Sequence, residues 1–167
     1  MLLVPIEHVT AALNWRIGTT DIAMTSISFR HINKEQDCIA CYPVMLELRP
    51  NLNGRETFVE QFRRQSDQGY RLLAAWQGEH VVALAGYRFQ ENMLYGRFVY
   101  IDDLVVAAGV RSEGLGRKLI EAVREEAKRL RCDRLVLDTG LSNTLAQRFY
   151  FRQGLLAKGL HFVEAVD

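Results

Sequence analysis

Residues 97–138 contain the pattern that most restricts the fold of this chain. The segment RFVYIDDLVV (97–106) has the apolar and β-branched character of a strand, and RLVLD (134–138) is a second, shorter one. Between them, residues 115–130 carry apolar side chains along one helical stripe, at Leu115, Leu119, Ile120, Val123, Ala127 and Leu130. This strand–helix–strand order predicts a right-handed crossover between two parallel strands.

The rest of the chain alternates between strand-like and helix-like patterns. Before this unit we expect strands at 26–32, 70–76 and 80–89, and helices at 35–48 and 55–67. After it we expect a short helix at 143–152 and a final strand region at 155–165. This order predicts the α/β (α+β) class, with a mixed, mostly antiparallel sheet of about six to seven strands flanked by about four helices.

The chain length of 167 residues indicates one domain of ordinary size, which we place at 25–167. Residues 1–24 fit the pattern of the rest poorly. We interpret them as an N-terminal extension, either an accessory arm or the product of an upstream start codon. No basic residue precedes the apolar start MLLV, which is unlike a signal peptide, so we expect a cytoplasmic location.

Charge and hydropathy exclude two classes of partner. The net charge is +1 and the pI is about 7.8, which gives no general attraction to nucleic acid or to an anionic membrane surface. No apolar run has the length of a membrane span. We therefore expect neither nucleic acid nor membrane as a partner, and any basic site must be local.

The three cysteines are Cys38, Cys41 and Cys132. The first two form a CxxC, which in other settings marks a redox pair or half of a zinc site. Neither a second pair nor a histidine cluster accompanies it. We interpret the two residues as small apolar side chains on one face of a helix, and we expect no metal.

The segment VRSEGLGRKL (110–119) places positive charge at the positive end of a predicted helix. Arg117 and Lys118 lie in its first turn, and Arg111 lies just upstream. A helix N-terminus exposes unpaired N–H groups and disfavours cations by a few tenths of a kcal/mol each, about 0.3 at the surface. A bound anion removes the conflict. Phosphate is the usual anion, because glycines let the backbone approach it closely.

Spacing tests which phosphate loop this could be. The dinucleotide fingerprint GxGxxG needs a glycine at 119, where the chain has Leu119. The Walker loop, started at Gly109, needs a lysine at 115, where the chain has Leu115. Neither motif fits.

What remains is R-x-x-G-x-G, formed by Arg111, Gly114 and Gly116. Further on, NTLAQRFYFRQG (143–154) fits N-x-x-A-x-x-[LF]-Y-x-x-x-G. Over about 25–165, the chain resembles the GNAT N-acetyltransferases in both motifs and in the order of its elements. The resemblance implies the GNAT fold, a sheet splayed between 97–106 and 134–138, and acetyl transfer from acetyl-CoA, as co-substrate, to an amine by direct attack in a ternary complex.

The resemblance also implies which residues bind the cofactor. Backbone amides of 112–117 would hold the pyrophosphate, and the strand edge at 104–106 would pair with the pantetheine amides. Asn143 would contact the cofactor or steady the last loop. The full cofactor set is Leu104, Val105, Val106, Arg111, Ser112, Glu113, Gly114, Leu115, Gly116, Arg117, Asn143 and Tyr150.

Acetyl transfer needs a proton acceptor near the amine and a proton donor near the sulfur. By resemblance, Tyr150 is the donor. For the acceptor, Asp102 and Asp103 stand side by side in an apolar strand, and regular alternation predicts that they face opposite sides of the sheet. The family position favours Asp102, with Asp103 structural. Asp103 and water remain alternatives.

The acceptor amine is not identified by the sequence. Candidates for its pocket are Glu47, Arg49, Tyr87, Arg88 and His161. The runs LDTG, RFY and HF resemble a bacterial histone-acetyltransferase-like subgroup. Two alternatives stay open, namely a catalytically silent domain that binds CoA as a sensor and an unrelated phosphate-binding protein. A homodimer is also left open.

Overall fold

A computed structural model describes residues 26–111 and 113–166, so the extension expected at 1–24 lies outside the described residues. The helices follow the expected ranges closely: α1 (Glu35–Leu48), α2 (Arg55–Asp67), α3 (Leu115–Arg129) and α4 (Thr144–Arg152), with a 3₁₀ turn η1 (Ala108–Val110). The strands are β1 (Ile27–His31), β2 (Tyr70–Gln77), β3 (His80–Asn92), β4 (Gly96–Val106) and β5 (Arg134–Leu137).

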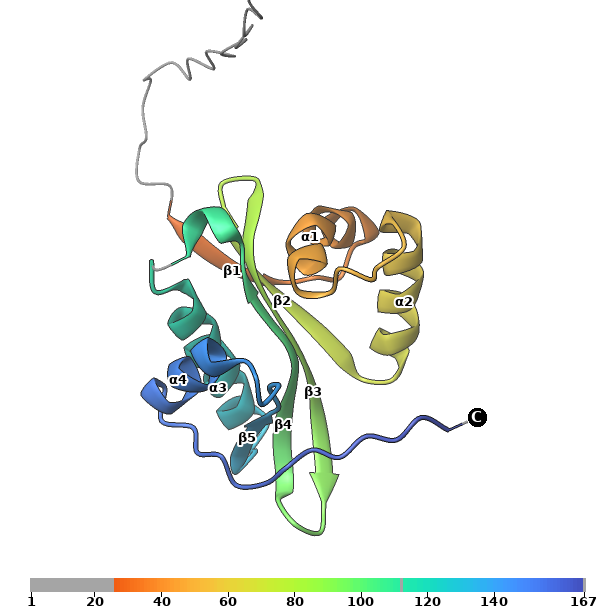
Figure 1. The fold of residues 1–167 in the computed structure, drawn as a ribbon. Helices are drawn as coiled ribbons and strands as arrows, with labels where there is room; N and C mark the ends of the chain where they lie inside the picture. The colour runs from red at the N-terminus through yellow and green to blue at the C-terminus, as the bar shows by residue number, and fades with distance from the viewer. Residues whose placement is uncertain (1–25, 112, 167) are drawn as a thin grey trace, which may run out of the picture.

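The strands form one sheet in the order β1-β2-β3-β4-β5. The first four strands pair antiparallel, and β4 pairs parallel with β5 through the α3 crossover. Figure 1 shows α1 and α2 on one face of the sheet and α3 and α4 on the other. The expected mixed, mostly antiparallel sheet with four helices is confirmed.

Each face of the sheet has its own apolar core. On the α1–α2 face, Cys38 and Cys41 pack with Leu72, Trp76 and Leu84. On the α3 face, the stripe predicted for 115–130 packs against the other side chains of the same strands, including Tyr87 and Val99. The helix stripe and the sheet therefore shield each other from water, which is the main force that holds such layers together.

The strand expected at 155–165 is absent from the described structure, so its sheet has five strands rather than six or seven. Residues 155–166 instead run along the end of the sheet, away from α4 (Figure 1). Apolar side chains there are exposed, at Leu156, Leu160, Phe162, Val163 and Val166. Strand-like composition shows that a segment suits a sheet, but it does not show that the segment pairs with another strand.

A bulge in β4 changes the direction of its side chains. Gly86 of β3 pairs with Asp103 and Tyr87 pairs with Ile101, so Asp102 has no residue opposite it. Up to the bulge, odd-numbered residues of β4 such as Val99 pack on the α3 face; beyond it, the even-numbered Leu104 and Val106 do. The prediction that Asp102 and Asp103 face opposite sides is therefore wrong, because the extra residue puts both on the α1–α2 face.

Gly86 lies opposite this bulge and leaves room for a neighbouring ring. A Cβ at this position would lie 1.9 Å from the Tyr70 hydroxyl and 2.5 Å from its Cζ. Tyr70 is buried, and its hydroxyl donates to Asp103 at 2.8 Å. The absence of a side chain at Gly86 thus lets Tyr70 reach across the sheet to the bulge.

Substituting Gly86→Ala should destabilise the fold, because the new methyl group overlaps the buried Tyr70 ring and forces its hydroxyl away from Asp103. We expect a loss of about 1–3 kcal/mol in the free energy of unfolding, as for other overpacked cores. Urea unfolding measures this. Gly159→Ala is the control, since nothing lies within 4 Å of a Cβ there. Equal midpoints for the two variants would contradict the expectation.

Candidate active site

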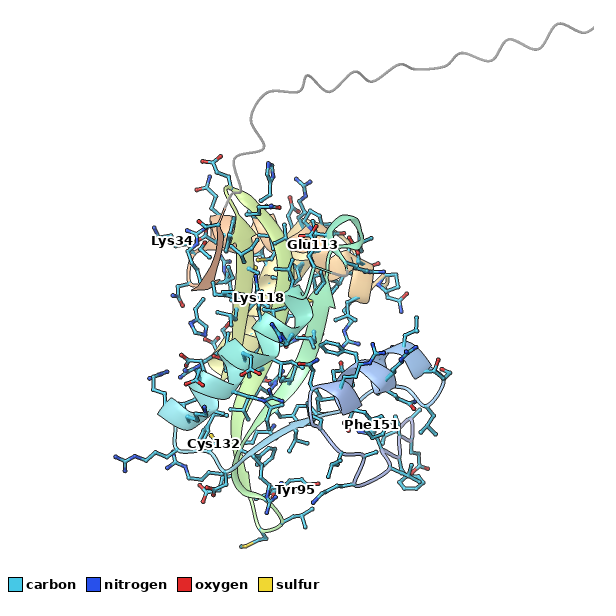
Figure 2. All side chains as sticks on the ribbon, turned by 90° about the vertical axis from the view of Figure 1, so that its left-hand side faces the viewer. Lys34, Tyr95, Glu113, Lys118, Cys132 and Phe151 are labelled. Carbon is cyan, nitrogen blue, oxygen red and sulfur yellow. The ribbon has the colours of Figure 1, made fainter. Side chains whose placement is uncertain are left out.

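The glycine segment forms the start of α3. Gly114 is its N-cap, with a left-handed φ of 76° that favours glycine, and no acidic side chain occupies the first turn. Figure 2 shows Glu113 and Lys118 at this end of the helix. The unpaired N–H groups of the first turn and the basic side chains nearby fit a pyrophosphate. Ser112, expected in this loop, lies outside the described residues.

Arg111 is held in place beside this loop. Its Nε donates to the Val106 carbonyl at 3.1 Å, and its Nη2 donates to Glu47 Oε2 at 3.1 Å. Glu47 also accepts the Ala108 N–H at 2.9 Å. Glu47 was a candidate for the acceptor pocket, but the structure places it at the glycine loop, where it joins α1 to η1 and orients the arginine.

Gly116 allows α4 to pack on the first turn of α3. A Cβ at Gly116 would lie 3.1 Å from Cζ of Phe149 and 3.4 Å from its Cε2. The Phe149 ring in turn packs edge-on against Tyr150, with ring centroids 5.4 Å apart. The second glycine of the motif therefore fixes the position of the helix that carries Tyr150, in addition to serving the loop.

Tyr150 lies on α4, half-buried, and burial raises the pKa of its phenol. It stays protonated at neutral pH and can donate a proton. Asn143 is the N-cap of α4, and its Oδ1 accepts the Ala146 N–H at 3.2 Å. Of the two roles expected for Asn143, the structure shows how it steadies the last loop.

The pairing between β4 and β5 ends near the bulge. β5 ends at Leu137, which pairs with Ile101, whereas β4 continues to Val106. Residues 104–106 therefore have no β5 partner. Just past β5, Asp138 accepts a hydrogen bond from Tyr100 and contacts His161 Nδ1 at 2.7 Å.

A pocket of about 460 Å³ opens on the α1–α2 face beside the bulge. Its apolar wall comes from α1, α2 and the loop between them. Its polar side chains come from α2, from the strands β2, β3 and β4, and from Arg49 and Asn51 just after α1. The lining residues are Met45, Arg49, Asn51, Leu52, Phe58, Gln61, Phe62, Gln65, Tyr70, Arg88, Asp102 and Asp103.

The two aspartates of this pocket differ in their surroundings. Asp103 accepts from Arg49 Nε at 2.9 Å and from the Tyr70 hydroxyl at 2.8 Å, and its side chain is only 12% exposed. Asp102 has a longer contact, 3.2 Å to Arg88 Nε. Burial raises the pKa of the Asp102 carboxyl, and Arg88 opposes this shift. Asp102 is therefore the carboxylate better suited to take up a proton.

Two other candidates for the pocket lie elsewhere. Tyr87 is fully buried on the α3 face, where its hydroxyl contacts His31 Nε2 at 2.7 Å. His161 lies beside Asp138 and is not among the residues that line the pocket. Successive side chains of β3 alternate between the two faces of the sheet here, so Tyr87 faces α3 while the next residue, Arg88, faces the pocket.

Several residues of this region were not among those expected from the sequence. Tyr70, Gln65 and Gly86 support the aspartates or their arginines, and Tyr100 bonds Asp138 just past the end of β5. Gly86 had a signal, since glycine inside a strand often marks a close approach or a bulge. Asp138 lies in the run LDTG noted in the sequence, and the other three residues had no comparable signal.

A larger hollow of about 600 Å³ lies around His31, Arg71, Glu126 and Arg129. Unlike the pocket beside the bulge, it is lined by neither Asp102 nor Asp103, so size alone would point away from the expected proton acceptors. The CxxC also lies apart from the site. Cys38 and Cys41 are fully buried on one face of α1, and burial raises the pKa of Cys38 to about 12, as the apolar interpretation requires.

No helix in the described part of the chain is long and apolar enough to cross a membrane.

The contact between Gly116 and Phe149 can be tested by a double-mutant cycle. Gly116→Ala should destabilise the protein, by about 1 kcal/mol or more, because Phe149 must shift. Phe149→Leu removes the ring edge, so the double variant should be less destabilised than the two single changes added together. Unfolding free energies measure the coupling. Strict additivity would show that the two side chains do not meet.

Comparisons with known proteins agree with this geometry. Residues 38–155 match the Acetyltransferase (GNAT) family. An uncharacterized N-acetyltransferase YhdJ of Bacillus subtilis is 28% identical over 125 residues, which are 74% of this chain and 87% of that protein. The aminoalkylphosphonate N-acetyltransferase of Salmonella typhimurium is 25% identical over 145 residues, 86% of this chain and 94% of that one.

A solved structure shows the same fold. The aminoglycoside N-acetyltransferase AAC(6')-Iy in complex with CoA has a TM-score of 0.75 to this structure, at 15% identity over 84% of this chain and 95% of that one. The family match covers most of the chain, including the glycine loop and α4. The chain therefore belongs to the GNAT acetyltransferase family and is an N-acetyltransferase.

Proposed function

We propose that the protein transfers the acetyl group of acetyl-CoA to a primary amine by direct attack in a ternary complex. The observation that best supports this is the course of β4. Its bulge supplies Asp102 to the pocket, and its end leads through η1 to Arg111 and the glycine loop. One strand thus connects a pocket fit for an amine with a loop fit for a pyrophosphate.

In this reaction the amine nitrogen bonds to the acyl carbon, the C–S bond breaks, and a proton moves from nitrogen to sulfur overall. Asp102 accepts the proton of the amine, directly or through water, and its raised pKa makes it a stronger base than an ordinary aspartate. Asp103 holds Arg49 and Tyr70 and serves the structure. Tyr150 donates a proton to the leaving thiolate.

Cofactor binding separates this proposal from its rivals. Acetyl-CoA should raise the melting temperature, while ATP and NAD at equal concentration should not, since neither nucleotide loop is present. Thermal-shift assays measure this, and calorimetry gives the affinity. Absence of any effect of acetyl-CoA would overturn the proposal. A silent sensor would bind acetyl-CoA but release no thiol with any amine.

Tyr150→Phe removes the proton donor and leaves the ring against Phe149. The turnover number should fall by about 10²-fold or more, in the range of general acid catalysis, while the affinity for acetyl-CoA changes little. Thiol release and calorimetry measure the two quantities. Phe151→Leu is the control on the same helix, since that ring is 55% exposed. Unchanged turnover in Tyr150→Phe would remove Tyr150 as the acid.

Asp102→Asn removes the proton acceptor at nearly constant volume. We expect kcat/KM to fall by about 10²-fold or more near neutral pH. In the native enzyme, kcat/KM should rise with pH as Asp102 loses its proton, and because its pKa is raised, this limb lies above the usual range for aspartate. The limb should vanish in Asp102→Asn. Asp133→Asn, an exposed loop position, is the control; equal rates in both variants would exclude Asp102.

Four further inferences from the sequence remain proposals. These are the histone-acetyltransferase-like subgroup, the domain limits at 25–167 with an extension before them, a cytoplasmic location and a homodimer. The subgroup rests on short runs around Asp138, Tyr150 and His161, and it does not identify the acceptor.

A further inference from the structure

The charges of the pocket beside the bulge form two pairs. Its ionisable carboxylates are Asp102 and Asp103, and its cations are Arg49 and Arg88; its other lining residues are apolar, amides or tyrosine. Arg49 pairs with Asp103, and Arg88 pairs with Asp102. The pocket by itself is therefore electrically neutral, with both signs of charge lining it.

Hydrogen bonds fix the positions of Arg49 and Arg88 but do not use all of their N–H donors. Arg88 is 20% exposed; its Nε donates to Asp102, its Nη2 donates to Gln65 at 2.9 Å, and its guanidinium lies 5.4 Å from the centre of the Tyr70 ring. Arg49 uses Nε and Nη2 on Asp103 and on the Asp102 carbonyl. In the described part of the chain, the Nη1 group of neither arginine has a hydrogen-bond partner. Each guanidinium thus keeps donors for a ligand.

The proton transfer changes this balance. An amine arrives as an ammonium, which adds one positive charge to a neutral pocket. When Asp102 takes the proton, its charge is lost, and Arg88 is left as a cation without its counter-ion. A cationic amine therefore leaves an excess positive charge in the pocket both before and after the transfer. Phe58, Phe62 and Leu52 line the same pocket and make that excess more costly.

An anionic group on the same substrate removes the excess. We propose that the acceptor is a small zwitterionic amine, whose amino group faces Asp102 and whose anionic group binds the free guanidinium donors of Arg49 and Arg88. This inference rests on the acetyl transfer proposed above. A carboxylate and a phosphonate share the required chemistry, since both accept paired N–H donors from arginine. The pocket volume of about 460 Å³ suits a small molecule.

The proposal is tested with a matched set of amines and purified full-length enzyme. The set is 3-aminopropanoate, 2-aminoethylphosphonate, the uncharged-tail analogue 3-aminopropanamide, and 1,3-diaminopropane with a cationic tail. Thiol release from acetyl-CoA gives kcat/KM, expressed per unprotonated amine so that differences in amine pKa do not enter. At least one of the two anionic amines should exceed the amide and the diamine by 10-fold or more, and the better of the two identifies the anionic group.

Arg49→Met shows whether the preference comes from the pocket. It should lower kcat/KM for the better anionic amine at least 10-fold more than kcat/KM for the amide, so the ratio between them falls. Loss of structure would instead lower both and weaken acetyl-CoA binding. Arg49→Glu should shift the preference toward the diamine. Arg64→Met is the control, because Arg64 is exposed on α2 and does not line the pocket.

The outcomes separate this inference from the acetyl transfer itself. If the amide or the diamine is used as well as the anionic amines, or if Arg49→Met lowers all of them alike, the zwitterion proposal is wrong and the transfer reaction stands. If acetyl-CoA binds but none of the four amines is acetylated, the zwitterion proposal also falls. The transfer reaction falls only if a wider set of amines, including lysine peptides, releases no thiol either.

Discussion

The bulge at Asp102 is the feature on which the rest of the site depends. One extra residue in β4 turns two consecutive carboxylates toward the same helical layer, where a regular strand would bury one of them against α3. Two half-buried acids need partners, and the structure supplies them from both sides: Arg49 from the end of α1, and Arg88 from β3. The pocket is thus built around a local irregularity of the backbone.

The same irregularity connects the pocket to the packing of the sheet. Asp103 accepts the hydroxyl of Tyr70, and that ring fits only because Gly86 has no side chain. Burial of the Tyr70 phenol, together with the nearby Asp103 charge, raises its pKa, so it remains a donor across the accessible pH range. Gly86 on β3 therefore lets Tyr70 on β2 hydrogen-bond to Asp103 on β4. Asp102 is left as the more available base.

The two glycines of the loop have different structural roles. Gly114 takes the left-handed conformation that starts α3, whereas Gly116 gives the Phe149 ring room to approach. The first glycine serves the backbone turn, and the second sets the distance between α3 and α4. Tyr150 follows Phe149 directly in α4. The position of the proposed acid therefore depends on Gly116, a residue that the motif associates only with the cofactor.

Much of the fold could be predicted from local patterns. Helices α1 to α4 and strands β1 to β5 appear within a few residues of their expected limits, because each has either a clear apolar period or clear breaking residues. The strand expected at 155–165 was predicted wrongly, since strand-like composition shows that a segment suits a sheet and not that it pairs with another strand. Glu47 and Tyr87 do not line the pocket. Glu47, near the end of α1, bonds Ala108 and Arg111, and Tyr87 on β3 faces α3.

The sequence by itself determined the class of chemistry. Basic residues at a helix N-terminus demand an anion, and the spacing of Arg111, Gly114 and Gly116 rejects two nucleotide loops and fits a third motif. Only the tertiary structure decided which side chains meet. The bulge, the orientation of Asp102 and Asp103, and their pairing with Arg88 and Arg49 all depend on hydrogen bonds between strands that are distant in the chain. No local period records such pairings, because a shift of one residue in register reverses every side chain beyond it.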